Sequence, residues 1–158
     1  MAVESKHAVY TPCSLDFADR VRSSFARQGI MTHMGAQLLR VLPGEVENSL
    51  SFRQELTQQH GFLHAGVITT IMDSACGYAA LSLMPAGASV LTVEFKVNLL
   101  NPAKGAQFVA RGMVVKSGRT LTVCSGEVLV VDSGNPQLIA TMTATMILLQ
   151  DRAGIAAG

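Results

Sequence analysis

The chain has few charges, few aromatic residues and no closely spaced cysteines. Only 15% of its 158 residues are charged, 5% are aromatic, and tryptophan is absent. The net charge is +1 without a basic cluster, which disfavours nucleic-acid binding, because that requires concentrated positive charge. So little charge, in a chain that is 49% hydrophobic, predicts that part of the surface is buried against other copies. The scarcity of aromatic residues argues weakly against a pocket that stacks an aryl group.

The three cysteines, Cys13, Cys76 and Cys124, form neither a C-x-x-C motif nor a zinc-binding spacing. We therefore expect free thiols and a cytoplasmic location, where thiols stay reduced. The first 17 residues lack the apolar segment of a signal peptide. Residues 65–84 are long and apolar enough to cross a membrane, but their small residues and central Asp73 argue against insertion.

The N-terminal part predicts one helix and then a hairpin. In "TPCSLDFADRVRSSFARQG", Thr11 or Ser14 is expected to cap the helix and Gly29 to end it. An apolar stripe at every fourth residue predicts a helix packed on the body of the protein, with a substrate lid as the alternative. Pro43-Gly44 predicts a turn, and the alternation over 45–53 predicts an antiparallel strand.

The rest of the chain predicts a long helix followed by four strands. The helix is "HAGVITTIMDSACGYAALSLM", residues 64–84, expected to end near Pro85. Turn residues near Asn101, Ser117 and Ser133 separate the later β-rich runs. This order predicts an α+β fold in which an antiparallel sheet wraps around the helix. Because the helix is apolar on all sides, a second chain would cover the side that the sheet leaves open.

Asp73 lies in the middle of this apolar helix, and its role has two interpretations. It can be a structural carboxylate paired with a neighbouring polar group. Alternatively, burial raises its proton affinity and suits it to act as a nucleophile or a general base. The free backbone N–H groups of Ala65, Gly66 and Val67 at the helix start could then hold a developing oxyanion.

Ala65 and Asp73 are eight residues apart, or about 12 Å along the axis of a helix. A single carbonyl group cannot contact both positions of the same helix. If both groups act on one substrate, two helices must pack antiparallel across a two-fold dimer and share the site.

Three segments together resemble the hotdog-fold acyl-CoA thioesterases of the PaaI (phenylacetate-pathway) type, over about residues 35 to 149. They are "QQHGFLHAGVITTIMDSACGYAALS", "LTVEFKVNLLNPAKG" and "ARGMVVKSGRTL". The family pattern is His-Gly-Gly, six residues and Asp, and here the spacing is intact at His64, Ala65, Gly66 and Asp73. The resemblance implies a hotdog fold, hydrolysis of an acyl-CoA thioester, no metal or redox cofactor, and a homodimer with shared sites that pairs into a homotetramer.

The resemblance also implies roles for individual residues. Asp73 corresponds to the catalytic carboxylate, either nucleophile or general base. Ala65 corresponds to a glycine whose N–H polarises the thioester carbonyl, a departure that requires a negative φ at Ala65. His64 is expected to shape the loop, with a structural and a catalytic role both open.

Further positions are assigned to the substrate. Gln58 lies where relatives carry an amide that orients water or the carbonyl, and Gln59 is the alternative if the register shifts by one. His60 is expected near the entrance, and Thr92 either places water or is an ordinary strand threonine. The turn Ser117, Gly118, Arg119 and Thr120 resembles one that contacts the phosphates or pantetheine of CoA, with a plain β-turn as the alternative.

The sequence therefore predicts a segment 1–34 with one helix, a hotdog thioesterase domain over 35–150 and a frayed tail over 151–158. Two alternatives to a thioesterase remain open. One is a hydroxyacyl-thioester dehydratase, which would need a histidine beside a carboxylate. The other is a non-catalytic acyl-CoA-binding or regulatory protein, which the Ala65 departure keeps open. The acyl group itself is not predicted, because fold does not fix substrate.

Overall fold

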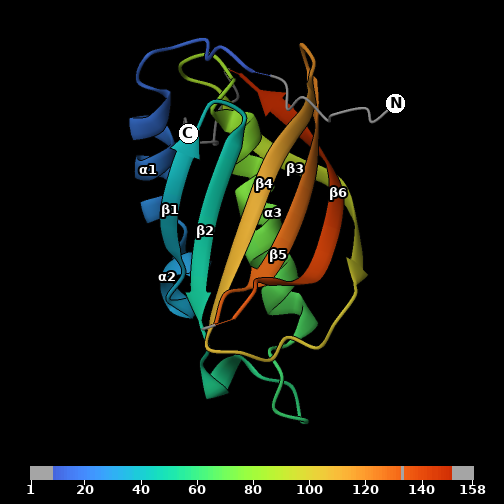
Figure 1. Ribbon diagram of the computed structural model, residues 1–158. Coiled ribbons are helices and arrows are strands. Elements are labelled where there is room, and N and C mark those ends of the chain that lie inside the picture. The colour runs from blue at the N-terminus through green and yellow to red at the C-terminus, as the bar shows by residue number, and fades with distance from the viewer. Residues whose placement is uncertain (1–8, 133, 151–158) are drawn as a thin grey trace, which may run out of the picture.

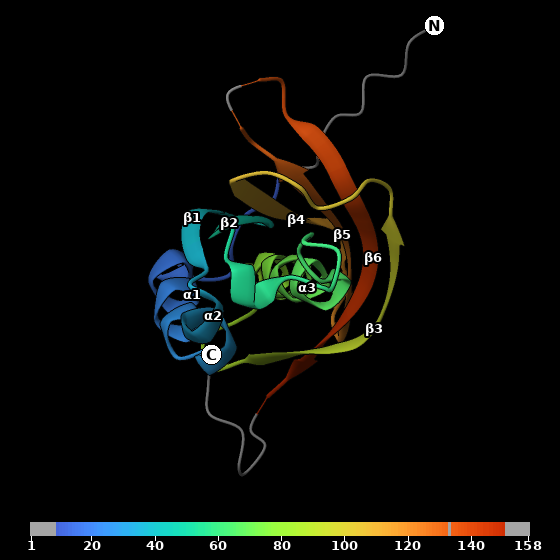
Figure 2. The same cartoon turned by 90° about the horizontal axis from the view of Figure 1, so that it is seen from below.

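A six-stranded antiparallel sheet wraps around one long helix in the computed structural model, which describes residues 9–132 and 134–150. The helix is α3 (Ala65–Leu81), and the strand order is β1-β2-β4-β5-β6-β3. Figures 1 and 2 show α3 inside the curve of the sheet. The strands are β1 (Gln37–Leu42), β2 (Glu45–Ser51), β3 (Ser89–Leu99), β4 (Gln107–Ser117), β5 (Leu121–Val130) and β6 (Gln137–Leu149). The predicted α+β architecture is confirmed.

Two glycines let α3 lie directly on the sheet. Gly112 of β4 and Gly126 of β5 are paired across the two strands. A Cβ on Gly112 would lie 2.3 Å from the carbonyl carbon of Ala75, and one on Gly126 would lie 2.7 Å from Cγ of Met72. Real atoms do not approach so closely, so a larger residue at either position would push α3 away. The absence of side chains at these two glycines lets the helix pack close to the sheet.

The N-terminal segment differs from its prediction. It forms two helices, α1 (Phe17–Ala26) and α2 (Gly29–Met34), because the backbone is extended at Gln28. Neither Thr11 nor Ser14 caps α1. The N-cap is Asp16, and the Ser14 hydroxyl hydrogen-bonds to its carboxylate instead. Gly29 therefore starts a second helix rather than simply ending the first, and the predicted tail, 151–158, lies outside the described residues.

The hairpin and the apolar stripe of the N-terminal half are as predicted. Gly44 takes a φ of 77° in the turn between β1 and β2. Val21 and Phe25 of α1 are buried, and the Phe25 ring lies 5.8 Å from that of Tyr78 on α3. Figure 2 shows α1 and α2 beside β1, so one edge of the sheet is covered by these helices. A short 3₁₀ helix, η1 (Gln54–Leu56), precedes the loop to α3.

A buried side chain on β2 fixes the turn of α3 that precedes Asp73. Asn48 is 0% exposed, and its Nδ2 donates to the carbonyl oxygen of Ile71 at 3.0 Å. Its Oδ1 is buried without a partner in the described chain. The side chain thus contacts α3 from the sheet side, two residues before Asp73.

We expect Asn48→Ala to lower the free energy of unfolding by about 1–3 kcal/mol, because the substitution removes a buried hydrogen bond and leaves a void. Urea unfolding at neutral pH measures this. Asn135→Ala, at an exposed position between β5 and β6, is the control and should change the free energy little. An Asn48 variant as stable as the control would show that this contact contributes nothing to the fold.

Candidate active site

Asp73 lines a cavity of about 300 Å³ between α3, α1 and β3. The Thr92 hydroxyl of β3 donates to its Oδ1 at 2.8 Å. Burial raises the pKa of the Asp73 carboxyl, and the Thr92 hydrogen bond partly lowers it again. The side chain therefore has the raised proton affinity that a general base or nucleophile needs, in a cavity that a substrate can enter. We call this the Asp73 cavity.

The start of α3 faces a different cavity. Gln58 and Ala65 line a space of about 390 Å³ with apolar residues that include Leu99 and Ile139. We call this the Ala65 cavity. None of the residues that line it lines the Asp73 cavity. Within one chain the structure thus separates the candidate residues into two groups, as the helical spacing of Ala65 and Asp73 requires.

One of the three N–H groups considered at the helix start is free to bind a ligand. The N–H of Gly66 donates to His64 Nδ1 at 2.9 Å, and that of Val67 donates to the His64 carbonyl at 2.9 Å. The N–H of Ala65 has no acceptor among the described residues. Ala65 is the first residue of α3, where φ is negative, so alanine is compatible with the position. The geometry therefore favours Ala65 over Gly66 as the oxyanion donor.

His64 is the N-cap of α3, since its ring nitrogen accepts the Gly66 N–H. A Cβ on Gly66 would lie 3.1 Å from that nitrogen, so the small residue permits the cap. His64 precedes Asp73 by nine positions, and no histidine lines the Asp73 cavity. Within one chain, the arrangement fits the loop-shaping role of His64 and does not pair a histidine with Asp73.

The loop before α3 favours Gln58 over Gln59. Residues 58–61 form a tight turn in which the Gly61 N–H donates to the Gln58 carbonyl at 3.0 Å. The Gln58 Oε1 accepts the His60 N–H, and its Nε2 has no acceptor in the described chain. Gln59 and His60 are exposed and do not line the Ala65 cavity. Only Gln58 of the three therefore lies beside Ala65.

The turn from Ser117 to Thr120 joins β4 to β5 and is exposed throughout. The Gly118 N–H donates to the Leu121 carbonyl at 2.9 Å, and a Cβ on Gly118 would lie 2.5 Å from that oxygen. Figure 1 shows this turn at the end of the sheet opposite the start of α3. Within one chain, Arg119 therefore lies apart from Ala65 and Gln58.

The two buried cysteines offer no reactive thiolate. Cys76 and Cys124 are buried free thiols, and burial raises the pKa of Cys124 to about 12. Burial also raises the pKa of Cys76. Cys13 is exposed, and its thiol donates to the Leu83 carbonyl at 3.0 Å. The prediction of core thiols is confirmed for Cys76 and Cys124.

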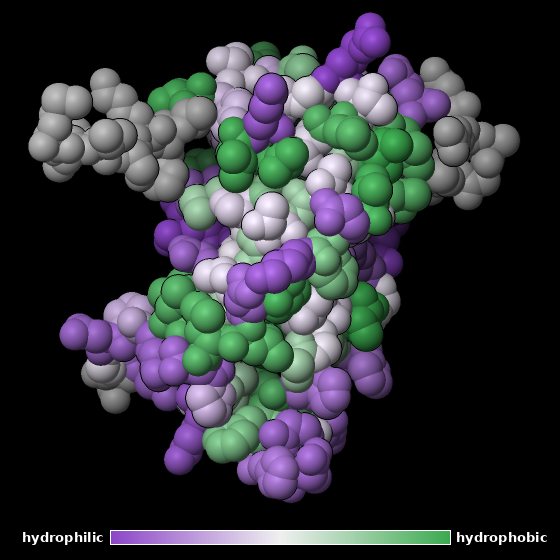
Figure 3. Space-filling model, turned by 90° about the vertical axis from the view of Figure 1, so that its right-hand side faces the viewer, coloured by the Kyte–Doolittle hydropathy of each residue, from purple (hydrophilic) through white to green (hydrophobic). Residues whose placement is uncertain are grey.

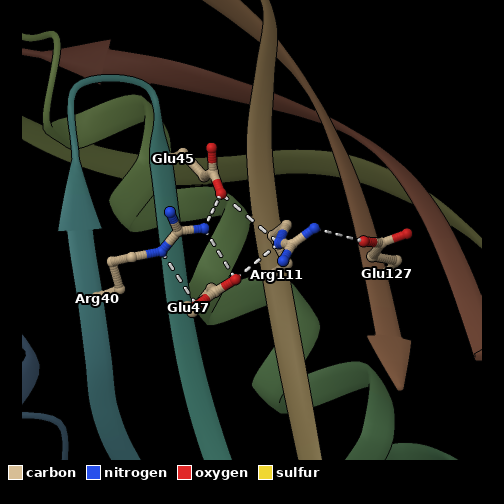
Figure 4. A network of polar contacts seen from close by, with 5 residues as sticks. All are labelled: Arg40, Glu45, Glu47, Arg111 and Glu127. Atoms are coloured by element: carbon tan, nitrogen blue, oxygen red, sulfur yellow. Dashed lines mark hydrogen bonds and ion pairs between the residues drawn. The ribbon is translucent and has the colours of Figure 1, made fainter. Parts of the chain in front are cut away.

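Charged side chains cross the outer face of the sheet, away from α3, as Figure 4 shows. Arg111 of β4 bonds Glu47 of β2 at 2.7 Å and Glu127 of β5 at 3.3 Å, and Arg40 of β1 bonds Glu47 at 3.0 Å. Burial would raise the pKa of Glu47, but its bonds to the two arginines outweigh this and lower it. With Glu45, carboxylates outnumber guanidinium groups in the network, so this face does not attract the phosphates of CoA.

Comparison with known proteins identifies the family. A sequence model described as "Thioesterase superfamily" matches residues 60–136. A crystal structure of a thioesterase family protein from Silicibacter pomeroyi is 55% identical, with a TM-score of 0.83, and covers 85% of this chain and 98% of that one. The chain belongs to the thioesterase superfamily. Its architecture is the hotdog fold that the sequence predicts.

Two other similar proteins are more distant. Human acyl-coenzyme A thioesterase 13 is 32% identical over 89 residues, which are 56% of this chain and 63% of the human protein. The E. coli PaaI protein of the phenylacetic acid degradation operon is 16% identical, covers 91% of this chain and 98% of that one, and has a TM-score of 0.76. That likeness shows the shared fold alone.

Four further predictions concern a membrane span, a metal site, the cellular location and the domain boundaries. No helix within residues 9–132 and 134–150 has the length and hydropathy of a membrane span. In the same residues, no group of three or more His, Cys, Asp or Glu side chains is placed to hold a metal ion. The cytoplasmic location and the boundaries of the 35–150 domain stay predictions.

Proposed function

We propose that this protein is an acyl-CoA thioesterase that hydrolyses a thioester to a carboxylic acid and free CoA. The observation that carries the proposal is Asp73, a half-buried carboxylate with a raised pKa, held by Thr92 in a cavity. As a general base, Asp73 takes a proton from water, whose oxygen attacks the carbonyl carbon. As a nucleophile, it forms a mixed anhydride that water then hydrolyses. In both routes the C–S bond breaks and the CoA sulfur leaves.

The active site is shared between two chains in this proposal. The Ala65 N–H of one chain polarises the carbonyl, and the Asp73 carboxylate of the partner chain attacks or activates water. Gln58 accompanies Ala65, and Thr92 accompanies Asp73, as the two cavities group them. Ala65 and Asp73 of one chain lie about 12 Å apart along α3. A partner packed antiparallel would place its own Ala65 opposite this Asp73, and its Asp73 opposite this Ala65.

The surface beside α3 supports this dimer. β3 is an edge strand whose Leu91, Val93 and Phe95 are 49%, 54% and 46% exposed. Figure 3 shows apolar side chains gathered in patches on the side of the molecule where β3 and β6 lie. An edge strand with exposed apolar residues is a template for pairing with another chain. The homotetramer implied by the resemblance stays a prediction that light scattering measures.

CoA enters the proposal as part of the substrate, without a metal or redox cofactor. The exposed Ser117, Gly118, Arg119 and Thr120 turn is the proposed contact for its phosphates. In the antiparallel dimer, this end of one chain lies near the start of the partner's α3. The turn can therefore reach a substrate that the partner's Ala65 holds. Gln59 and His60, exposed in the loop before α3, are proposed to border the entrance.

Release of free thiol from short, long and aromatic acyl-CoAs tests the proposal. We expect turnover of at least one class. If the protein binds these compounds but releases no thiol from any of them, it is a binding protein and the proposal is wrong.

We expect Thr92→Val to shift the acidic limb of the pH–rate profile to higher pH. The Thr92 hydrogen bond lowers the pKa of Asp73, so its loss raises that pKa, and a higher pH is needed to ionise the carboxylate. The profile of kcat/KM measures the shift. Thr143→Val, at an exposed position of β6, is the control. An unchanged profile for Thr92→Val would mean that ionisation of Asp73 does not limit the reaction.

A further inference from the structure

Most of the residues that line the Asp73 cavity have polar side chains, although apolar atoms make up the larger part of its surface. Ligand pockets are usually lined by hydrophobic side chains with a few polar groups, but here the only aliphatic side chains are Leu81 and Val90. The volume of about 300 Å³ is at the small end of the range for ligand pockets. The small volume therefore limits the length of an acyl chain, and an unsubstituted alkyl chain would leave the polar side chains of the lining without a partner.

Hydrogen-bond donors from α1, α3 and the segment after α1 line the same cavity as Asp73. Tyr78 is 4% exposed, and its hydroxyl donates to Ser24 Oγ on α1 at 3.3 Å, a long bond. Gln28 accepts the Ser74 hydroxyl on its Oε1 at 3.1 Å, and its Nε2 has no acceptor within the described chain. Arg27 lies at the rim, exposed, and donates to the Ser23 carbonyl at 3.2 Å.

The charge of Arg27 affects the pKa of Tyr78 in this cavity. Burial raises the pKa of Tyr78, and both the Ser24 hydrogen bond and the Arg27 charge lower it. The net pKa is raised, so the hydroxyl keeps its proton at neutral pH and stays a donor. The side chains of Tyr78, Gln28 and Arg27 carry O–H or N–H groups and line one cavity, and an ionised carboxylate is an acceptor only.

The position of Tyr78 on α3 sets the length of the group that fits. Tyr78 follows Asp73 by five residues, about 7.5 Å along the helix axis. An acyl group whose carbonyl is attacked at Asp73 and whose chain runs along α3 brings its far end to Tyr78 after a few carbon atoms.

We propose that the Asp73 cavity holds the acyl group and selects a short one that ends in a hydrogen-bond-accepting oxygen group, above all a carboxylate. Tyr78 and Arg27 are the residues that determine this specificity. The inference rests on the proposed thioesterase function and names the substrate class of the same site.

The test uses CoA thioesters of a six-carbon chain that ends in a carboxylate, a hydroxyl or a methyl group. We expect wild type to favour the carboxylate over the methyl ending by at least about 10-fold in kcat/KM, because a site built to hydrogen-bond a group discriminates against its absence. Tyr78→Phe keeps the ring against Phe25 and should reduce this ratio, as should Arg27→Gln. Arg22→Gln is the control, since Arg22 is exposed on α1 and does not line the cavity.

Several results would overturn the inference. A preference for the methyl ending would show an apolar site, and a preference for the hydroxyl would show that Arg27 does not select charge. If both variants keep the carboxylate-to-methyl ratio of kcat/KM but hydrolyse all substrates more slowly, Tyr78 and Arg27 contact the CoA part of the substrate instead. Thiol release without carboxylate preference leaves the thioesterase function intact, whereas no release from any thioester contradicts that function and this selectivity with it.

Discussion

Replacing Asp73 with Asn should lower kcat/KM for thioester hydrolysis by at least ~10²-fold. The amide keeps the size of the carboxyl and can still accept the Thr92 hydrogen bond, but it neither takes a proton from water nor attacks a carbonyl. Free-thiol release under kcat/KM conditions measures the loss. Asp73→Ala should lose as much, because the reactive group rather than the volume matters.

The loss of activity should come without a loss of stability. Burial raises the pKa of Asp73, so the folded protein binds this proton more tightly than the unfolded chain does. The stability gained from protonation is complete below the unfolded pKa and is lost as pH rises through the folded pKa. At neutral pH the ionised carboxylate opposes folding, and Asp73→Asn should therefore have an equal or higher Tm. A destabilised variant that retains activity would make Asp73 a structural residue.

Replacing Ala65 with Pro should lower kcat by about 10²- to 10³-fold, as the loss of one oxyanion donor does in other enzymes. Proline removes the backbone N–H of Ala65 and nothing else that the helix needs. It is well tolerated at the first position of a helix, whose N–H has no intrahelical partner. The preceding residue, His64, has a ψ of 140°, which is the conformation that proline favours before it.

Ala65→Gly is the matched control for the proline variant. Glycine keeps the N–H and is the residue that the family resemblance places here, so the variant should retain most of its activity. Circular dichroism and the Tm show whether α3 is intact in both. A folded proline variant with full activity would mean that the carbonyl is polarised by another group.

The sequence predicts α3 and the strands because their apolar periodicity is strong and uninterrupted. It also predicts the separation of Ala65 from Asp73, since helical rise alone fixes that distance. The break between α1 and α2 is not predicted, because the extended backbone at Gln28 depends on tertiary contacts. The packing role of Gly112 and Gly126 is not predicted for a similar reason. It depends on the contact between their strands and α3, where a Cβ would clash.

Several features of the candidate site also depend on geometry that the sequence does not show. The His64 cap and the free Ala65 N–H follow from local backbone geometry that a motif does not specify. The polar wall of the Asp73 cavity combines α1, α3 and β3, which are far apart in the sequence, so no local pattern reveals it. One signal is present in the sequence. Ser24, Arg27 and Gln28 are polar residues at and just after the end of α1, and the apolar stripe of that helix does not account for them.

Mixing two inactive variants tests the shared site most directly. Asp73→Asn and Ala65→Pro are each prepared as dimers, denatured together at equal concentration and refolded. In the mixed dimer, the Asp73 of one chain meets the Ala65 of the other, so one of its two sites has no substitution. The account predicts recovery of about a quarter of wild-type thiol release, because half of the dimers are mixed and each has one intact site. No recovery, in mixed dimers shown by mass measurement to have formed, would contradict a site built from two chains.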